Sequence, residues 1–379
     1  MENSQPTPLF GDNFEVVPEP QSKKLVIYFT ATGAPPRIFN FWKPGNAIKT
    51  SRIFLSNARS WYQQGVPGLG GSVEETVETI RKWARHLGVE QIYTVGGSMG
   101  GYGAALFGCL LEARVMAFSF ESELDFEGSR SRKLMDRETV LTHRDLKPLI
   151  ARARQPFFAV IGERDAVDAY SVNRILGLPM VRVKSIKGVL HGPQNYLSKR
   201  DRLVPLLEAF IAGFDEMPRM PEDGDLLSRV GFSDLFYKTY NHHRLKQWDD
   251  VLDCGRRALA IMPSSDQCNW FVGEALLSLG KGQEAYPYLF TAFHSGGRSA
   301  QFYFSLANCL RKMELHDDAI KTYRETLKKW PEHAPSHYGL GLSYLNLGYR
   351  EKAGVAFREA ARLAPNNEAY TARARKFVA

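Results

Sequence analysis

Cysteine is scarce in this chain and long apolar runs are missing, and each absence narrows what the protein can be. Only 4 of the 379 residues are cysteine, and none forms a Cys-x-x-Cys pair, so neither a disulfide framework nor a thiolate metal site is predicted. No apolar run approaches the roughly 20 residues that a membrane span requires. Residues 1–19 carry acids and prolines where a secretory signal would have a basic start and an apolar stretch. We therefore expect a cytoplasmic protein that has no membrane span and keeps its cysteines reduced.

The alternation of apolar runs and helical stretches predicts the fold class of the first domain, residues 1–215. The clearest helix begins at Ser72, with Glu75 as the partner of a capping box, and ends before Gly88. Several apolar runs are nearly continuous, as in strands that are buried on both faces. We expect strands at residues 25–30, 52–56, 91–95, 115–120, 157–161 and 180–186. Strands and helices in this order predict an α/β fold with a doubly wound, mostly parallel sheet.

The pattern changes near Asp215, as a chain long enough for two domains suggests. Residues 216–231 are rich in proline and acids and are predicted to be a linker. Beyond them, residues 232–379 repeat with a period of 34. Positions in register are Val251, Ala285, Ala319 and Ala353, then Gly273, Ala307 and Gly341, and then Leu289, Tyr323 and Phe357. Small residues let the two helices of a hairpin approach, and the larger ones fill the gap to the next hairpin. This part of the chain resembles the tetratricopeptide repeat, which implies an all-α solenoid that binds a protein partner or self-associates.

A glycine-rich turn carries the strongest chemical signal. The segment Gly96-Gly-Ser98-Met-Gly100-Gly101 follows a predicted strand and precedes a predicted helix at 102–112. A sharp strand-to-helix turn lifts the serine hydroxyl above the sheet edge, and small neighbours let the turn close. The helix that follows directs its N-terminal amides at any oxyanion that forms. The segment lacks the Gly-Lys-Ser/Thr of a phosphate-binding loop. The pattern predicts that Ser98 is a nucleophile.

A nucleophilic serine needs a base to take its proton and an acid to orient that base. The first domain holds three histidines, and His191 lies on a loop with glycine and proline that follows a predicted strand. The preceding strand ends in Asp165, while Asp168 is a second candidate for the acid. Ser98, Asp165 and His191 each lie just beyond the C-terminal end of a strand, where active sites of parallel sheets form.

Residues 21–212 resemble the α/β-hydrolase superfamily through the glycine-rich turn, the strand that ends in Asp165 and the late His191-Gly. The resemblance implies that Ser98 is the nucleophile, His191 the general base and Asp165 the orienting acid. It also implies an oxyanion hole made by the backbone N–H of Met99 with that of Ala31 or Thr32. The loop with Ala31 and Thr32 differs from the His-Gly-Gly-Gly of lipases, which argues against long acyl chains.

A basic segment lies where this fold would hold a cap over the serine. Between residues 129 and 154, eight cations stand against Asp136, Glu138 and Asp145; the cations are Arg130, Arg132, Lys133, Arg137, Arg144, Lys147, Arg152 and Arg154. Composition alone favours a solvated surface. The position favours substrate binding by Arg130, Arg132 and Lys133, and hence an anionic substrate. No recognition motif for nucleic acid is present, so no nucleic-acid partner is expected.

Two functions remain open from the sequence. The first is a serine ester hydrolase, or a related acyltransferase, that acts through an acyl-enzyme on an acylated, polar, anionic substrate of carbohydrate type. The glycine-rich turn also resembles that of proteins associated with bacterial surface polysaccharides, and this resemblance implies that the acyl group is carried by a sugar. The repeats would then bind a protein partner, and no cofactor or metal is expected. The alternative is a non-catalytic repeat scaffold that carries a passive hydrolase-fold domain.

Overall fold

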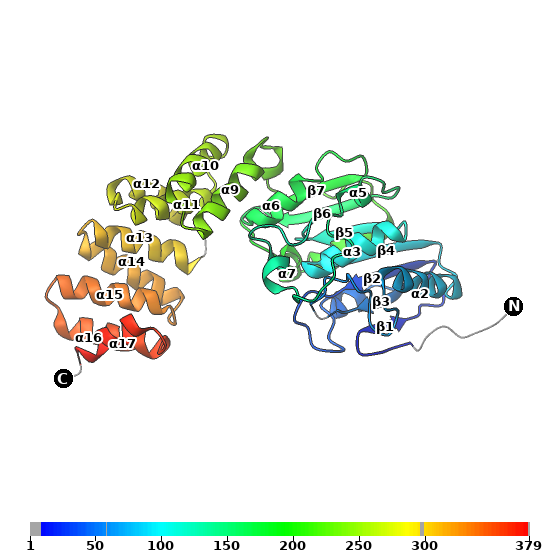
Figure 1. Ribbon diagram of the computed structural model, residues 1–379, viewed down its shortest axis with the longest axis horizontal. Helices are drawn as coiled ribbons and strands as arrows, with labels where there is room; N and C mark the ends of the chain where they lie inside the picture. Colours follow the sequence, from blue (N-terminus) through cyan, green and yellow to red (C-terminus); the bar gives the residue numbers. More distant parts are fainter. Residues whose placement is uncertain (1–8, 58, 296–298, 378–379) are drawn as a thin grey trace. The chain divides into compact units, whose positions relative to one another are not determined.

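A computed structural model describes residues 9–57, 59–295 and 299–377. Figure 1 shows the elements along the chain. The chain divides into two compact units, and the division falls between Tyr237 and Lys238. Residues 1–8 of the N-terminal segment examined for a signal lie outside the described part. None of the helices that the structure describes combines the length and the apolar character needed to cross a lipid bilayer. All four cysteines are free thiols, as predicted.

The N-terminal unit is built on a seven-stranded sheet with the order β1-β3-β2-β4-β5-β6-β7. All neighbours pair in parallel except β1 and β3, which are antiparallel. The strands are β1 (Phe14–Val17), β2 (Lys24–Phe29), β3 (Ser51–Leu55), β4 (Gln91–Gly97), β5 (Arg114–Phe118), β6 (Phe157–Gly162) and β7 (Val181–Ile186). The six predicted strands are confirmed to within two residues at each end. The edge strand β1 was not predicted.

Helices cover both faces of this sheet. They are α1 (Trp42–Asn46), α2 (Val73–His86), α3 (Met99–Leu110), α4 (Arg130–Leu134), α5 (Lys147–Ile150), α6 (Ala166–Asn173), α7 (Pro193–Ser198) and α8 (Leu203–Ala212), followed by the short 3-10 helix η1 (Leu226–Ser228). On one face, Leu207 and Phe210 of α8 pack against Tyr93 and Phe158 of the strands. Helix α3 packs against β2, β4 and β5. The predicted cap of α2 is present, because the Ser72 hydroxyl accepts a hydrogen bond from the Glu75 N–H.

The prediction of a linker at residues 216–231 is wrong for most of these residues, because they fold onto the sheet. The N–H of Lys187 donates to the carbonyl of Glu222 (2.8 Å), and the N–H of Gly224 donates to that of Ser185 (2.9 Å). The buried carboxylate of Glu163 accepts from the N–H of Leu226 (2.8 Å). Proline and acidic residues suggested solvent exposure, but the segment satisfies backbone groups beside β7 and so belongs to the N-terminal unit.

The second unit is all helical within residues 238–295 and 299–377. Its elements are the end of α9 (Phe232–Arg244), α10 (Trp248–Ile261), α11 (Asp266–Ser278), α12 (Gly282–His294), α13 (Ala300–Lys312), α14 (His316–Lys329), α15 (Ala334–Asn346), α16 (Arg350–Leu363) and α17 (Glu368–Arg375). The small residues of the repeat lie where helices meet. A Cβ on Gly273 would come within 2.5 Å of Leu289, and one on Gly341 within 2.6 Å of Phe357. The predicted place of the small residues between the two helices of a hairpin is confirmed, but Leu289 and Phe357 pack against the glycine of their own hairpin rather than only towards the next one.

Candidate active site

Ser98 lies on the predicted sharp turn between β4 and α3. Its backbone has φ 58° and ψ −125°, a region that costs a non-glycine residue about 1–3 kcal/mol. The N–H of Ser98 donates to the carbonyl of Phe118 at the end of β5 (2.8 Å). Two glycines make the turn possible: a Cβ on Gly96 would lie 2.0 Å from the carbonyl oxygen of Gly100, and one on Gly100 would lie 2.2 Å from that of Phe29. Strain held in place by such close packing is typical of a functional residue.

His191 lies on the loop between β7 and α7, and the ends of two other strands hold this loop in place. A Cβ on Gly162, the last residue of β6, would be 2.0 Å from the carbonyl oxygen of Leu190. The N–H of Gly192 donates to the hydroxyl of Ser119, which follows β5 (3.1 Å). The loop therefore lies over the C-terminal ends of the strands, on the edge of the sheet where β4 delivers Ser98.

The carboxylate that faces His191 is Asp168, not Asp165. The Nδ1 atom of His191 lies 3.1 Å from both carboxylate oxygens of Asp168, which is fully buried. Asp165 instead caps α6, where it accepts from the N–H groups of Val167 and Asp168 (3.1 and 3.0 Å). A helix cap turns the Asp165 side chain along its own helix, whereas Asp168, one turn later, points at the ring. The expected pairing of His191 with Asp165 is corrected accordingly, in favour of the second candidate.

Arg130 links the two carboxylates, so its guanidinium is already engaged by protein groups where the sequence predicted contact with a substrate. Its guanidinium donates to Asp168 (3.1 Å) and to Asp165. The side chain is 24% exposed, and its charge is balanced by two carboxylates. Asp165, Asp168 and His191 lie close enough to share a metal ion, but Arg130 already supplies the positive charge that the two carboxylates need.

The electrostatics of this cluster favour a charged Asp168 beside a basic imidazole. Burial alone would raise the pKa of Asp168, but the charges of His191 and Arg130 outweigh it and hold that pKa below its usual range. Burial would lower the pKa of His191, and the Asp168 carboxylate outweighs this effect and raises it. Burial, together with the charge of Asp168, raises the pKa of Asp165. Asp168 therefore carries the negative charge that stabilises an imidazolium.

The second ring nitrogen of His191 is free to act. When the Nδ1–H group of the neutral ring donates a hydrogen bond to Asp168, the Nε2 atom carries a lone pair and can accept a proton. This atom is buried and accepts no hydrogen bond in the described part of the chain, from Ser98 or from any other residue. Catalytic hydrogen bonds are often long before substrate binds. A buried acceptor with no partner at this edge is suited to receive the Ser98 proton.

The oxyanion donors predicted from the sequence differ in their present partners. Met99 follows Ser98 as the first residue of α3, and its N–H donates to no other described residue. The N–H of Thr32 likewise donates to none. The N–H of Ala31 donates to the Oδ1 atom of Asn40 (2.7 Å). Sequence reasoning did not identify Asn40, because no pattern marks an asparagine nine residues after the loop that it contacts.

A cavity of about 640 Å³ opens beside this turn. Ala31, Gly97 and Gln194 are among the residues that line it. The Gln194 side chain lies so close to Gly97 that a Cβ there would be 2.4 Å from its amide nitrogen. Trp42 and Lys43 line the cavity as well. Sequence reasoning missed Gln194, although its position three residues after His191 is a usable signal.

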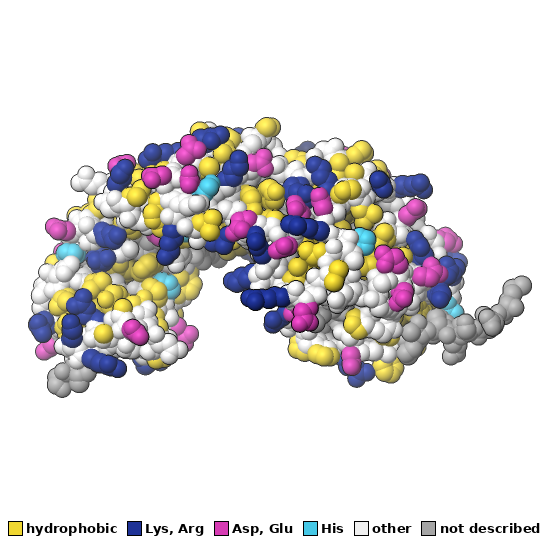
Figure 2. Space-filling model, in the orientation of Figure 1, with side chains coloured by type: hydrophobic (Ala, Val, Ile, Leu, Met, Phe, Trp, Pro, Cys, Tyr) yellow, Lys and Arg dark blue, Asp and Glu magenta, His cyan; other side chains and the backbone are white. Residues whose placement is uncertain are grey.

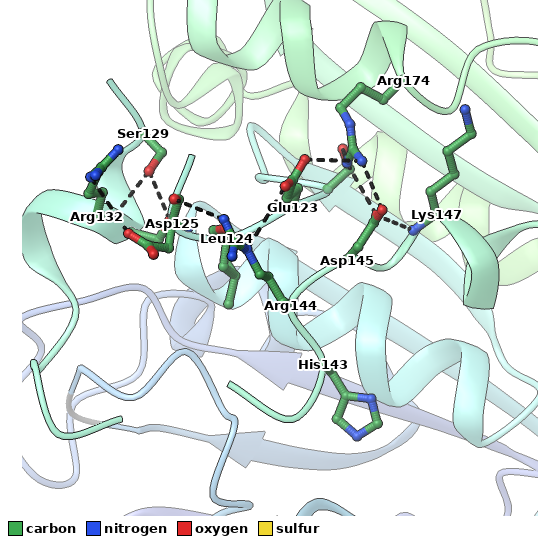
Figure 3. A network of polar contacts seen from close by, with 12 residues as sticks. Glu123, Leu124, Asp125, Ser129, Arg132, His143, Arg144, Asp145, Lys147 and Arg174 are labelled. Carbon is green, nitrogen blue, oxygen red and sulfur yellow. Dashed lines mark hydrogen bonds and ion pairs between the residues drawn. The ribbon is translucent and has the colours of Figure 1, made fainter. Parts of the chain in front are cut away.

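Half of the basic segment is neutralised, because four of its eight cations, Arg130, Arg132, Arg144 and Arg154, form ion pairs. Figure 3 shows Arg132 near Asp125 and Arg144 near Glu123. Arg132 also pairs with Glu127 at 2.8 Å. Lys133 is exposed. Acids from outside the segment, unseen when its own charges are counted, balance these four cations. The solvated-surface interpretation therefore describes Arg132 better than substrate binding does.

Comparison with known proteins bears on the repeats. Residues 304–368 match the tetratricopeptide repeat family, and the second unit therefore contains such repeats. No curated protein matches the sequence. The solved structures that are similar to this chain include the following three. YrrB, titled a TPR protein with an unusual peptide-binding site, is 20% identical, with a TM-score of 0.36 over 48% of this chain and 88% of YrrB. The Arabidopsis OM64 TPR domain is 16% identical, with a TM-score of 0.29 over 30% of this chain and 94% of that domain. MamA from Desulfovibrio magneticus RS-1 is 14% identical, with a TM-score of 0.35 over 46% of this chain and 93% of MamA.

Proposed function

We propose that the N-terminal unit is a serine-dependent ester hydrolase, or an acyltransferase that uses the same acyl-enzyme. The observation that carries the proposal is the strained backbone of Ser98 on the β4–α3 turn. At the same edge of the sheet, the Nε2 atom of His191 is buried and has no hydrogen-bond partner among the described residues. The Nδ1 atom of the same ring contacts the carboxylate of Asp168. Three side chains in these positions supply a nucleophile, a base and an orienting acid.

The reaction follows from the atoms in place. The Ser98 hydroxyl oxygen attacks the acyl carbon, and its proton moves to Nε2 of His191. The alcohol leaves with that proton, and an acyl ester remains on Ser98. Water then releases a carboxylic acid, or a second hydroxyl, such as that of a sugar, takes the acyl group. Asp168 stabilises the imidazolium in both halves, and the Met99 N–H supports the oxyanion.

The cavity indicates the substrate class. A volume of about 640 Å³ accommodates a small acyl group and part of a polar alcohol. Asn40 and Gln194 offer side-chain amides to hydroxyl groups, and Arg37 and Lys43 offer two positive charges against the single negative charge of Glu15. An acylated, polar, anionic substrate of carbohydrate type fits these groups. Support for an anion now rests on Arg37 and Lys43 rather than on the basic segment.

A second function is a repeat scaffold that binds proteins while the N-terminal unit is passive. The family match to the tetratricopeptide repeat favours it, because repeats of this kind present surfaces for protein interaction. The comparisons support this function better than they support catalysis. Both proposals share the protein-binding role of the repeats and differ only in the chemistry of Ser98.

A fluorophosphonate probe, which labels activated serines, separates the two functions. We expect the full chain to be labelled, Ser98→Ala to lose the label, and Ser295→Ala to keep it. Ser295 is a suitable control because its exposed hydroxyl donates to the carbonyl of Thr291 in its own helical turn and, among the described residues, to no other group. If the wild-type chain is not labelled above the level of Ser98→Ala, the passive scaffold is the correct function.

A further inference from the structure

A groove in the repeat unit lies apart from the serine site and has no assigned role. Its volume is about 950 Å³, and it is lined by α14, α15 and α16, within the residues that match the repeat family. Helix α15 contributes the floor, where Leu340 and Tyr344 are nearly buried. The walls are formed by α14 and α16, which are the second helices of two neighbouring hairpins. On the face shown in Figure 2, apolar and Lys or Arg side chains lie next to one another over α15 and α16.

The walls of the groove carry unbalanced positive charge. Arg324, Lys352 and Arg358 are exposed lining residues, and within the described ranges none of them forms an ion pair, although Arg358 donates a hydrogen bond to the carbonyl of Phe377 (3.0 Å). Arg324 and Lys352 extend from opposite walls over the ring of Tyr344, at 5.9 and 6.0 Å from its centre. Only one lining cation, Arg362, is matched by a carboxylate, that of Glu359 (2.6 Å). Charges left unpaired around a common floor attract an anionic ligand.

The groove also offers an apolar contact between these cations. Val355 on α16 is 60% exposed and lines the wall one turn from Lys352 and from Arg358. Together with the floor residues Leu340 and Tyr344, it forms a place for one apolar side chain. A ligand that fits must therefore carry carboxylates on both sides of an apolar group.

We propose that this groove binds an extended acidic segment of a partner protein, with one apolar side chain against Val355, Leu340 and Tyr344. Carboxylates on either side of it would meet Arg324 on one wall and Lys352 and Arg358 on the other. A nucleic acid fits less well, because Val355 and Leu340 give the groove aliphatic contacts where a nucleic acid needs aromatic stacking faces. The acidic segment of the chain itself is already engaged, since Glu222 pairs with Arg202 and Asp223 with Lys184. We therefore take a segment of a different protein as the occupant.

The test measures binding of a synthetic peptide to the full chain by fluorescence anisotropy. The probe is a fluorescein-labelled peptide with two acidic residues on each side of one leucine. The control probe is the same peptide with the corresponding amide residues, asparagine or glutamine, in place of the acidic ones. We expect binding of the acidic peptide alone, and binding should weaken as salt rises because exposed charges are screened within about 8–10 Å. Replacing two exposed cations with Arg324→Gln and Lys352→Gln should weaken it about 10-fold, at about 2- to 5-fold for each contact. Val355→Asp should weaken it as well.

Arg257→Gln is the matched control. This guanidinium on α10 is 63% exposed and pairs with Asp253, and its loss should leave binding unchanged. Thermal melting of each variant shows whether it is folded, and the two cation replacements keep the test valid if Val355→Asp unfolds. Equal binding of the acidic and amide peptides would overturn the proposal. So would an unaffected double variant, or displacement of the peptide by a single-stranded oligonucleotide at lower concentration than by unlabelled peptide.

Discussion

Exchange of single carboxylates for amides separates the roles of Asp165 and Asp168. Asp168 contacts Nδ1 of His191 with both oxygens, whereas Asp165 contacts backbone N–H groups of α6 and Arg130. In Asp168→Asn the amide can present a donor to Nδ1, which favours the wrong tautomer and leaves Nε2 protonated. Loss of such an orienting acid costs about 10³- to 10⁴-fold in turnover, or about 4–5.5 kcal/mol of activation free energy.

Asp165→Asn should affect folding more than turnover. An asparagine remains a good helix cap, so the cap itself costs little, and the main loss is one charged contact with Arg130. We expect turnover within about 10-fold of wild type. Hydrolysis of p-nitrophenyl acetate measures turnover, and the rate of fluorophosphonate labelling reports on Ser98 without a second step. Circular dichroism shows that each variant is folded.

The opposite ranking would refute this assignment. If folded Asp165→Asn loses as much turnover as Asp168→Asn, or more, then the contact of His191 with Asp168 does not orient the base. If both folded variants keep wild-type rates while Ser98→Ala is inactive, no carboxylate orients it. Either result can be read directly from the two rates.

Three further measurements test other features of the site. Because the pKa of His191 is raised above its ordinary value of 6.5 and the base must be neutral, turnover should rise with pH through a midpoint above 6.5, and a pH-independent rate between 5 and 9 would contradict a histidine base. Removing the buried charge with Arg130→Gln leaves two carboxylates without their cation and should lower the free energy of unfolding by about 3–5 kcal/mol in urea. Arg132→Gln, an exposed control at 53%, should change it by less than about 0.5 kcal/mol. Gly100→Ala places a Cβ 2.2 Å from a backbone oxygen and should cost about 1–3 kcal/mol or more, while Gly71→Ala, which has room, should cost little.

The parts of the fold that follow a strong local pattern were predictable. Strands β2 and β6 are nearly continuous apolar runs, and the turn at Ser98 is set by glycines next to one another in sequence. The period of 34 placed Gly273 and Gly341 where the two helices of a hairpin approach each other. Strand β1 was missed because it has four residues and alternates buried and half-buried positions at the edge of the sheet. So short a strand is defined by its partner rather than by its own pattern.

The candidate site was predictable in its residue types and not in its pairings. Asp165 and Asp168 lie within one turn of each other, and the direction of each side chain depends on where α6 begins. The cations of the basic segment were counted without Glu123 and Glu127, which lie outside it and pair with them. Which charges meet is decided by tertiary contacts, which have no signature in the sequence.

If the N-terminal unit is the proposed hydrolase, the hydrogen bond from the Ala31 N–H to Asn40 would give the site a preference between two states of the same substrate. A neutral ester carbonyl that replaced the Asn40 oxygen would exchange one neutral acceptor for another and gain nothing. A hydrogen bond to a negatively charged oxygen is roughly twice as strong as one to a neutral oxygen. Displacement of Asn40 from the Ala31 N–H would therefore be favourable for the oxyanion and not for the neutral ester. The donor would thus be withheld from the ground state and released to the tetrahedral intermediate, and binding would favour the reacting species over the resting ester.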